Sequence, residues 1–116
     1  MQRADPWSAT CPSRGIIEIL ASKWVLLLLP TLRRGPKRNG DLIRALDGVS
    51  QKMLTQTLRD LERYGIIKRH DFAEVPPRVE YSLTRIGASL AEVIDSLDDW
   101  VIKHYGPLMD AAARHT

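Results

Sequence analysis

The side chains best suited to bind a partner lie in residues 50–64, SQKMLTQTLRDLERY. At about 100° per residue of helix, four polar side chains fall on one side: Lys52, Gln56, Arg59 and Arg63. Arginine and glutamine match the major-groove edges of guanine and adenine, whereas lysine, threonine and serine suit phosphate oxygens. This face predicts contact with a nucleic acid. A merely solvated face is the alternative, because most amphipathic helices serve only a core.

The opposite side of the same stretch predicts a core contact. Leu54, Leu58 and Leu61 fall within a narrow arc. Ser50 can cap the free N–H groups at the start of the helix, and Gly65 suits the left-handed residue after its end. The pattern therefore predicts a helix with one buried and one exposed face.

The segments before this helix predict three shorter helices. An arm over residues 1–12 leads to the first helix, over residues 13–21. The second begins after Ser22, and its core side is drawn from Trp24, Leu27, Leu28 and either Val25 or Leu32. Pro30 should kink this helix or end it early, because proline lacks a backbone donor. The basic turn over residues 33–38 either touches phosphates or stays solvated.

A helix-turn-helix is expected next. Asn39 should cap a short helix from Gly40 to Leu46, which residues 47–49 close with a tight turn. A short helix, a turn and a second helix form the arrangement in which the second helix enters the major groove of DNA.

The hydrophobic period changes from helical to alternating after Gly65, which indicates two strands. The first covers residues 66–72, and the second presents Val79, Tyr81 and Leu83 on one face. The connecting turn carries two prolines and Arg78, a stiff tip that could place a guanidinium in a narrow minor groove. The predicted fold is mainly α with a small β wing, a winged helix-turn-helix.

A last long helix is expected from Thr84 to about Tyr105, where Gly106-Pro107 should stop it. Apolar side chains recur along it every three or four residues: Ile86, Leu90, Val93, Ile94, Leu97, Trp100 and Val101. This stripe is longer than a small winged domain needs. It predicts a homodimer formed through the N- and C-terminal helices, with packing inside one chain as the alternative.

Charge is unevenly distributed along the 116 residues, which carry a formal net charge of +3. Residues 33–70 hold ten Lys/Arg against four Asp/Glu, whereas residues 86–116 hold two against five. A basic segment around residues 50–64 suits a module that places one face on a polyanion. The expected divisions are an arm over 1–12, a domain over 13–106 and a tail over 107–116.

Several function classes are not expected. The N-terminus lacks a secretory signal and residues 24–29 are too short to cross a bilayer, which predicts a cytoplasmic protein without a membrane partner. The single cysteine excludes a disulfide within the chain, and the histidines lack zinc spacing, so no metal or cofactor is expected. Without a phosphate-cradling glycine loop or a nucleophile motif, an enzyme is not expected either.

A family resemblance rests on Lys23-Trp24, Gly35-Pro36, Asp41-Leu42, Val49 to Glu62, Gly65 to Ile67 and Glu74 to Thr84. In these motifs the chain resembles the HxlR-type winged helix-turn-helix regulators of bacteria, relatives of the MarR group. The resemblance covers about residues 11–100, and its segments 49–62 and 75–84 are the most specific. It implies a dimeric DNA-binding transcription regulator, usually a repressor.

Two such chains would dock their helices into successive major grooves of a pseudo-palindromic operator in double-stranded DNA, about 34 Å apart. The side chains expected at the DNA are Arg38, Ser50, Gln51, Lys52, Thr55, Gln56, Arg59, Arg63 and Arg78. Two alternatives stay open. One is a winged protein-interaction module, and the other is a regulator that responds to a small molecule in a dimer-interface pocket near Trp24 or Trp100.

The resemblance also implies a role for Cys11. In this family a cysteine before proline at the start of the domain often senses electrophiles, quinones, aldehydes or oxidants, and Cys11-Pro12 matches that position. A thiol ahead of a helix and near Arg14 should have a lowered pKa. A small, buried, inert cysteine is the alternative. With one cysteine per chain, signalling would need a disulfide between subunits, a mixed disulfide or direct alkylation.

Overall fold

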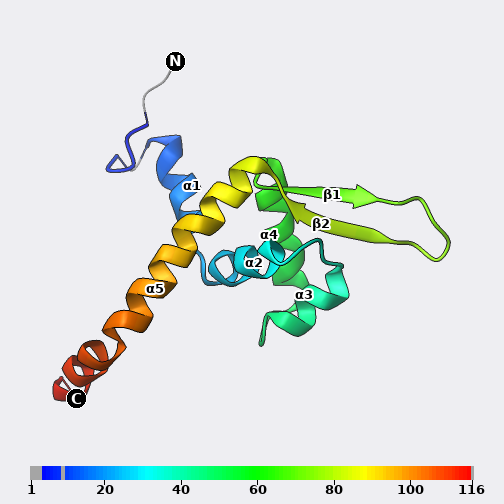
Figure 1. The fold of residues 1–116 in the computed structure, drawn as a ribbon. Coiled ribbons are helices and arrows are strands. Elements are labelled where there is room, and N and C mark those ends of the chain that lie inside the picture. The colour runs from blue at the N-terminus through cyan, green and yellow to red at the C-terminus, as the bar shows by residue number, and fades with distance from the viewer. Residues whose placement is uncertain (1–3, 9, 116) are drawn as a thin grey trace.

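The computed structural model describes residues 4–8 and 10–115, which fold as helices around one antiparallel pair of strands (Figure 1). In chain order the elements are α1 (Pro12–Leu20), α2 (Lys23–Arg33), α3 (Asn39–Ala45), α4 (Gln51–Arg63), β1 (Ile67–Asp71), β2 (Val79–Leu83) and α5 (Arg85–Arg114). The strands pair from Ile67 opposite Leu83 to Asp71 opposite Val79. Helices α3 and α4 followed by this ribbon confirm the predicted winged helix-turn-helix.

Helix α2 lies at the centre of the fold and contacts α1, α3, α4, α5 and β2. Its buried side chains are Val25, Leu28, Leu29 and Leu32. These positions follow the i, i+3, i+4, i+7 spacing of a helix buried along one side. The sequence prediction for Leu27 was wrong, because that residue falls on the opposite side of the helix and is 45% exposed. Leu29 takes the core position instead.

The rest of the core joins the helix-turn-helix to the wing and to α5. Its buried side chains are Leu42, Leu46, Leu54, Leu58, Leu61, Ile66, Ile67, Ala91 and Ile94. The polar Thr57 is buried among them, and its hydroxyl donates to the carbonyl of Met53 at 2.8 Å. A buried hydroxyl with a partner costs far less than an unpaired one.

Helix α1 begins one residue before its predicted start, with Cys11 as its N-cap residue. Of the predicted arm over residues 1–12, residues 1–3 and 9 lie outside the described part of the chain. Among the described residues, no single helix is long and apolar enough to cross a membrane. Helices α1 and α2 reach that length and composition only as a pair, which is bent by 65°.

Two prolines lie inside helices, where the sequence predicted a kink or an early end at Pro30 and a stop at Gly106-Pro107. Helix α2 continues past Pro30 to Arg33, and α5 continues past Pro107 to Arg114. A proline removes only one hydrogen bond, and the packing of α2 on both sides of Pro30 can offset that loss. Beyond Pro107 the residues LMDAAAR are mostly strong helix formers. Residues 107–114 therefore extend α5 and are not the separate tail that was predicted.

Helix α4 has the boundaries that its sequence predicts. Ser50 caps its first turn by accepting a hydrogen bond from the N–H of Met53 at 3.1 Å. At the other end Gly65 has a φ of +71°, and the N–H of Ile66 donates back to the carbonyl of Leu61 at 2.9 Å. This Schellman ending turns the chain at once from the helix into the wing.

Helix α3 begins differently from the prediction. Asn39 is its first residue, and Arg38 is the capping residue, whose N–H donates to the carboxylate of Asp41 at 3.0 Å. That hydrogen bond lowers the pKa of Asp41, which also pairs with Arg44 at 2.9 Å. The side chain of Asn39 is therefore free to bond elsewhere.

Helix α5 starts against the end of α4. Thr84 caps it by accepting a hydrogen bond from the N–H of Gly87, as predicted, and its hydroxyl is shared between the carbonyls of Gly65 and Ile66, at 2.5 and 3.0 Å. A Cβ added at Gly87 would lie 2.0 Å from that carbonyl oxygen, so only glycine allows this approach. The first half of α5 packs on α2, and the second half extends beyond the body of the fold (Figure 1).

We expect Gly87→Ala to destabilise the fold by about 2 kcal/mol or more, because α5 would have to move away from the chain at Ile66. Gly106→Ala is the matched control, since a Cβ there meets nothing within 4 Å and should stabilise α5 by about 0.5–1 kcal/mol. Urea unfolding followed by circular dichroism at one protein concentration measures both. Equal midpoints for Gly87→Ala and wild type would contradict the described contact.

Candidate nucleic-acid interface

The polar face of α4 is open to solvent. Its exposed side chains are Gln51, Lys52, Gln56, Arg59 and Arg63, while Thr55 is half-buried. Three of these already have a side-chain partner: Gln51 bonds to Asn39, Gln56 donates to Asp60 at 3.1 Å, and Arg63 lies 3.8 Å from the same carboxylate. Lys52 and Arg59 have no such partner among the described residues. They are the most available cations on the helix.

A reciprocal pair of amides joins α3 to the first turn of α4. Asn39 donates to Gln51 at 2.7 Å, and Gln51 donates back to Asn39 at 2.9 Å. Gln51 also lies 3.0 Å from the hydroxyl of Thr55. These bonds fix the angle between the two helices and orient Gln51. Sequence reasoning missed this role, because Asn39 was taken only as a helix cap.

A hollow of about 320 Å³ lies between α4 and the base of the wing. It is lined by Asn39, Thr55, Leu58, Arg59, Glu62, Arg69 and Tyr81. Arg69 on β1 stands opposite Tyr81 on β2. The sequence prediction of DNA contacts contained neither residue. The available signal was the alternation of β1, which places Arg69 on the same face as the buried Ile67.

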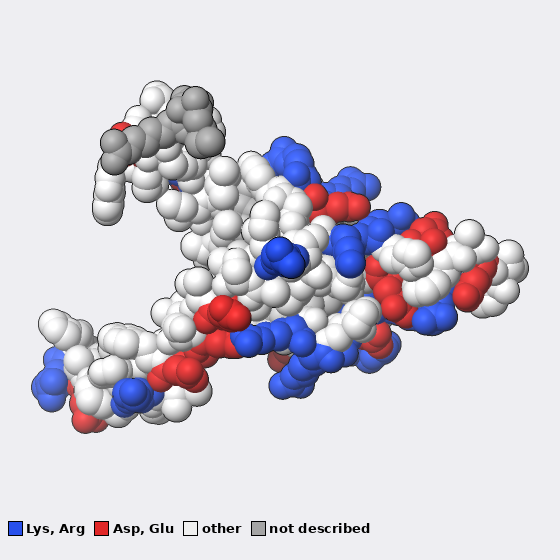
Figure 2. Space-filling model, turned by 45° about the horizontal axis from the view of Figure 1, so that its top comes forward, with Lys and Arg blue, Asp and Glu red and all other residues white. Residues whose placement is uncertain are grey.

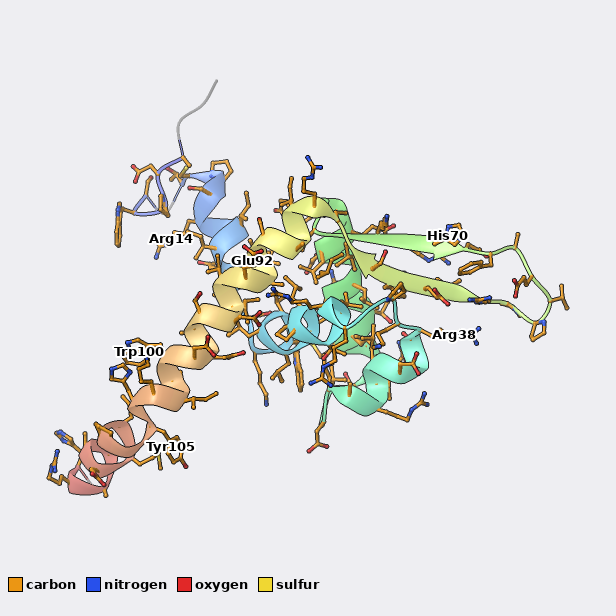
Figure 3. The ribbon with its side chains drawn as sticks, viewed as in Figure 1. Arg14, Arg38, His70, Glu92, Trp100 and Tyr105 are labelled. Carbon is orange, nitrogen blue, oxygen red and sulfur yellow. The ribbon has the colours of Figure 1, made fainter. Side chains whose placement is uncertain are left out.

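The basic turn before α3 is anchored to the wing. The backbone N–H and carbonyl of Lys37 bond to Tyr81 at 2.9 and 2.8 Å. Arg33, at the end of α2, is paired with Asp95 of α5 and is therefore not available to a phosphate. Arg38 is exposed at the start of α3 (Figure 3). The structure thus divides this turn into structural and solvent-facing cations.

The wing tip does not present Arg78 as a free guanidinium, which the sequence suggested. The guanidinium of Arg78 bonds to Glu80 at 2.9 and 3.2 Å, lies 3.8 Å from Glu74, and stacks over the ring of Phe72 at 4.0 Å. Residues 71–80 contain one arginine against three acids, Asp71, Glu74 and Glu80. A minor-groove contact by Arg78 stays a prediction, and it would require the guanidinium to leave these carboxylates.

The surface charge follows the same division. Figure 2 shows many of the basic side chains over the body of the fold, and acidic and basic side chains together along α5 and on the wing. Among the described residues no three His, Cys, Asp or Glu side chains gather as metal ligands would. The arrangement can therefore bind a polyanion through its body, with no described group placed for metal chemistry.

Cys11 is a half-buried free thiol at the N-cap of α1. Its sulfur lies 3.1 Å from the hydroxyl of Ser13 and accepts a hydrogen bond from the N–H of Asp5 at 3.2 Å. These hydrogen bonds lower the pKa of the Cys11 thiol, because they stabilise the thiolate. Arg14 was predicted to help lower the pKa of Cys11, but its guanidinium lies 3.8 Å from the carboxylate of Glu18.

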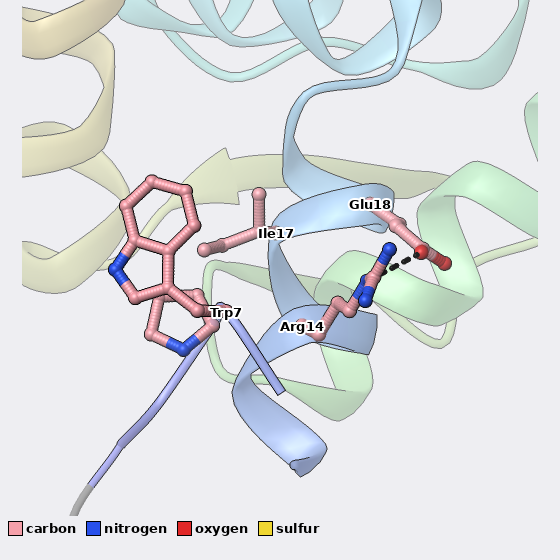
Figure 4. Close-up of a pocket in the computed structure, with 5 residues that line it drawn as sticks. Trp7, Arg14, Ile17 and Glu18 are labelled. Carbon is pink, nitrogen blue, oxygen red and sulfur yellow. Dashed lines mark ion pairs between the residues drawn. The ribbon is translucent and has the colours of Figure 1, made fainter. Parts of the chain in front are cut away.

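The same arm and helix form an open, largely apolar hollow of about 610 Å³ (Figure 4). Pro6, Trp7 and Ile17 line it together with the Arg14–Glu18 pair. Trp7 is 92% exposed, so its ring has almost no cover within the chain. An indole left in water is energetically costly and suits a surface that another chain covers.

The predicted dimerisation stripe of α5 is mostly unburied. Its exposed members are Ile86, Val93, Leu97, Trp100 and Val101, and the helix adds Ile102, Tyr105, Leu108 and Met109. Trp100 and Tyr105 project from the half of α5 beyond the body (Figure 3). Ile94 is only 2% exposed and Leu90 packs against the core, so their own chain uses these two predicted dimer residues.

Comparison with known proteins assigns the fold to a family. The model of the HxlR-like helix-turn-helix family matches residues 19–109. The chain belongs to that family. This HxlR-like protein is 41% identical over 101 residues to the HTH-type transcriptional regulator YtfH of Escherichia coli, which covers 87% of this chain and 80% of the relative.

Solved structures agree. The transcriptional regulator YtfH of Salmonella typhimurium is similar with a TM-score of 0.87 at 37% identity, covering 98% of this chain and 100% of that one. The redox regulator HypR in its reduced form has a TM-score of 0.78 at 32% identity, covering 85% and 98%. The HxlR-like protein is thus a transcriptional regulator with a helix-turn-helix DNA-binding fold, and its relatives are regulators rather than enzymes.

We expect Ser13→Ala to raise the pKa of Cys11 and slow its alkylation by iodoacetamide at neutral pH, because the thiolate loses a hydrogen bond. The measurement is the alkylation rate against pH. Arg14→Ala is the control and should leave the profile in place, since Arg14 pairs with Glu18. A profile that moves with Arg14→Ala and not with Ser13→Ala would contradict the assigned cause.

Proposed function

We propose that this HxlR-like protein is a homodimeric repressor that acts in the cytoplasm and reads a DNA operator with α4. The observation that carries the proposal is the separation of faces on α4. Its leucines are buried, whereas Lys52, Gln56 and Arg59 are exposed. The Asn39–Gln51 pair and the turn at Gly65 hold the helix at both ends, so its polar face is presented without rearrangement.

The exposed apolar face of α5 supports the dimer. A groove of about 520 Å³ between α2 and α5 continues this face and is lined by Leu26, Leu27, Pro30, Leu97 and Val101, with Lys23 and Asp98 at its rim. A second copy would cover Leu27, which the core leaves exposed. Two-fold pairing would set two α4 helices about 34 Å apart, matching a pseudo-palindromic operator.

The first test is fluorescence anisotropy with a labelled duplex from upstream of the protein's own gene. We expect binding that exceeds binding to a scrambled duplex and that weakens steeply as KCl rises, because phosphate contacts release counterions. Lys52→Ala should weaken binding, since Lys52 is exposed and has no ion-pair partner among the residues that the structure describes, whereas Lys103→Ala on the outer half of α5 should not. Equal weak affinity for both duplexes would favour a protein-binding role for α4.

Cys11 is the proposed switch. Its position before α1, its hydrogen bonds and its partial exposure favour a reactive thiolate. HypR, one of the structural relatives, is described as a redox regulator. Two Cys11 thiols of a dimer would lose two electrons and two protons to an oxidant and form one disulfide between subunits. Alternatively, each Cys11 thiol and one small thiol would together lose two electrons and two protons to the oxidant and form a mixed disulfide.

We expect diamide to weaken operator binding by wild type and to leave Cys11→Ser unaffected, because diamide accepts the two electrons and two protons that two thiols release. Non-reducing electrophoresis distinguishes a disulfide between subunits from a mixed disulfide. Dithiothreitol should restore binding. Loss of binding in Cys11→Ser as well would place the sensitive group elsewhere, and no loss in wild type would leave a regulator with another signal.

The dimer has its own test. We expect Trp100→Lys to shift the protein from dimer to monomer in sedimentation velocity, because a charge would enter the apolar face of α5. The indole ring of Trp100 is 51% exposed and stacks on the ring of His104, so the substitution should not disturb the core. Lys103→Ala is the control and should remain dimeric. A dimeric Trp100→Lys would exclude this part of α5 from the interface.

A further inference from the structure

The arginines of α4 and the wing divide into two classes. Arg63 lies beside Asp60, and Arg78 is held by Glu80 and Glu74. Arg59 and Arg69 have no ion-pair partner within the described part of the chain, although they come from different elements. Both are exposed, and both line the hollow between α4 and the base of the wing.

The hollow has the chemistry of an anion site. Two guanidinium groups offer forked N–H donors, which match the geometry of phosphate oxygens. Thr55 and Tyr81 add hydroxyl-bearing side chains, and the buried Leu58 also lines the hollow. One carboxylate, Glu62, also lines the hollow and reduces its charge without cancelling it. A volume of about 320 Å³ is large enough for a phosphodiester group.

We propose that this hollow binds one phosphodiester group of the DNA backbone between Arg59 and Arg69. The inference rests on the proposed DNA-binding function and gives it a further contact. Arg69, at the base of the wing, is then the wing's cationic contact with DNA in place of Arg78 at its tip. Arg59 acts on the backbone and sets the register of α4 in the groove, while base reading falls to other residues of the face.

The charges of the wing tip argue against the alternative, in which Arg78 is the wing's contact with DNA. Its three acids outnumber Arg78, and the guanidinium has carboxylate partners on two sides. Bringing this tip to the duplex would place Glu74 and Glu80 against phosphates of like charge. The base of the wing carries Lys68 and Arg69 without an acidic neighbour on β1 until Asp71. Positive charge is therefore available where the wing meets α4.

The test measures affinity for the upstream duplex and for a scrambled duplex of equal length over a range of KCl. We expect Arg69→Ala to weaken both by a similar factor, about five- to tenfold at low salt, and to reduce the slope of log affinity against log salt by about one. Arg59→Ala should cause the same loss of affinity for both duplexes and the same reduction of the salt slope. Arg114→Ala, at the far end of α5, and Arg78→Ala should change affinity less than twofold.

Glu62→Gln tests the same hollow with a change of affinity in the opposite direction. Removing this carboxylate from the hollow should strengthen binding to both duplexes by a similar factor. Circular dichroism and urea midpoints show whether each variant is folded, and Arg69→Lys, which keeps the charge but loses the forked donors, should weaken binding less than Arg69→Ala does. Millimolar inorganic phosphate at constant ionic strength should compete weakly, because a free anion lacks the contacts of the duplex.

The outcomes separate the two proposals. Wild type that binds neither duplex would reject the DNA-binding function itself, and this inference with it. Wild type that binds its operator while Arg69→Ala is unchanged would reject the inference alone. A loss confined to the upstream duplex would assign Arg69 to base reading, and a larger loss in Arg78→Ala than in Arg69→Ala would restore the tip as the contact. Either result overturns the backbone assignment.

Discussion

The carbonyl of Ile66 is the point on which the rest of the structure depends. It lies just after α4, and it accepts hydrogen bonds from the backbone N–H and the hydroxyl of Thr84, at 3.1 and 3.0 Å. Gly87 passes so close to it that no Cβ could fit. The side chain of Ile66 is itself buried in the core. The end of α4, the start of the wing and the first turn of α5 are therefore fixed to one another.

This junction connects the two surfaces that the proposed function requires. α4 carries the polar face, and α5 carries the apolar face that a second copy would cover. Because the helices meet at Ile66 without a flexible linker, the pairing of two α5 helices would determine the distance between two α4 helices. A chemical change at Cys11, on the helix before α2, would act on DNA binding only by altering that distance or the pairing itself.

Local sequence signals were enough for most of the fold. The caps at Ser50 and Thr84 and the glycine turn at Gly65 were all predicted, because each depends on residues within one or two turns. The predicted bend of α2 at Pro30 stays a prediction. The alternative of an early end there and the predicted stop of α5 at Gly106-Pro107 were wrong in one way. They treated a missing hydrogen bond as decisive, although the packing of α2 and the helix-forming residues after Pro107 outweigh it.

The site was harder to predict than the fold, because side-chain partners depend on how the chain turns and how its elements pack. The exposed face of α4 followed from its period, but the bond between Asn39 and Gln51 and the meeting of Arg59 with Arg69 depend on how α3, α4 and the wing pack. Arg78 looked free in the sequence. Its carboxylates lie only two and four residues away, and an alternating strand and tight turn bring them to it.

Methylation protection on the upstream DNA tests the central claim most directly, because dimethyl sulfate modifies guanine N7 in the major groove. Two α4 helices docked in successive major grooves should protect guanines at two positions about one helical turn, roughly 10 base pairs, apart on one side of the duplex. Protection at both positions that disappears with Lys52→Ala would support the account. An unprotected major groove in a bound complex, or a single protected position, would contradict it.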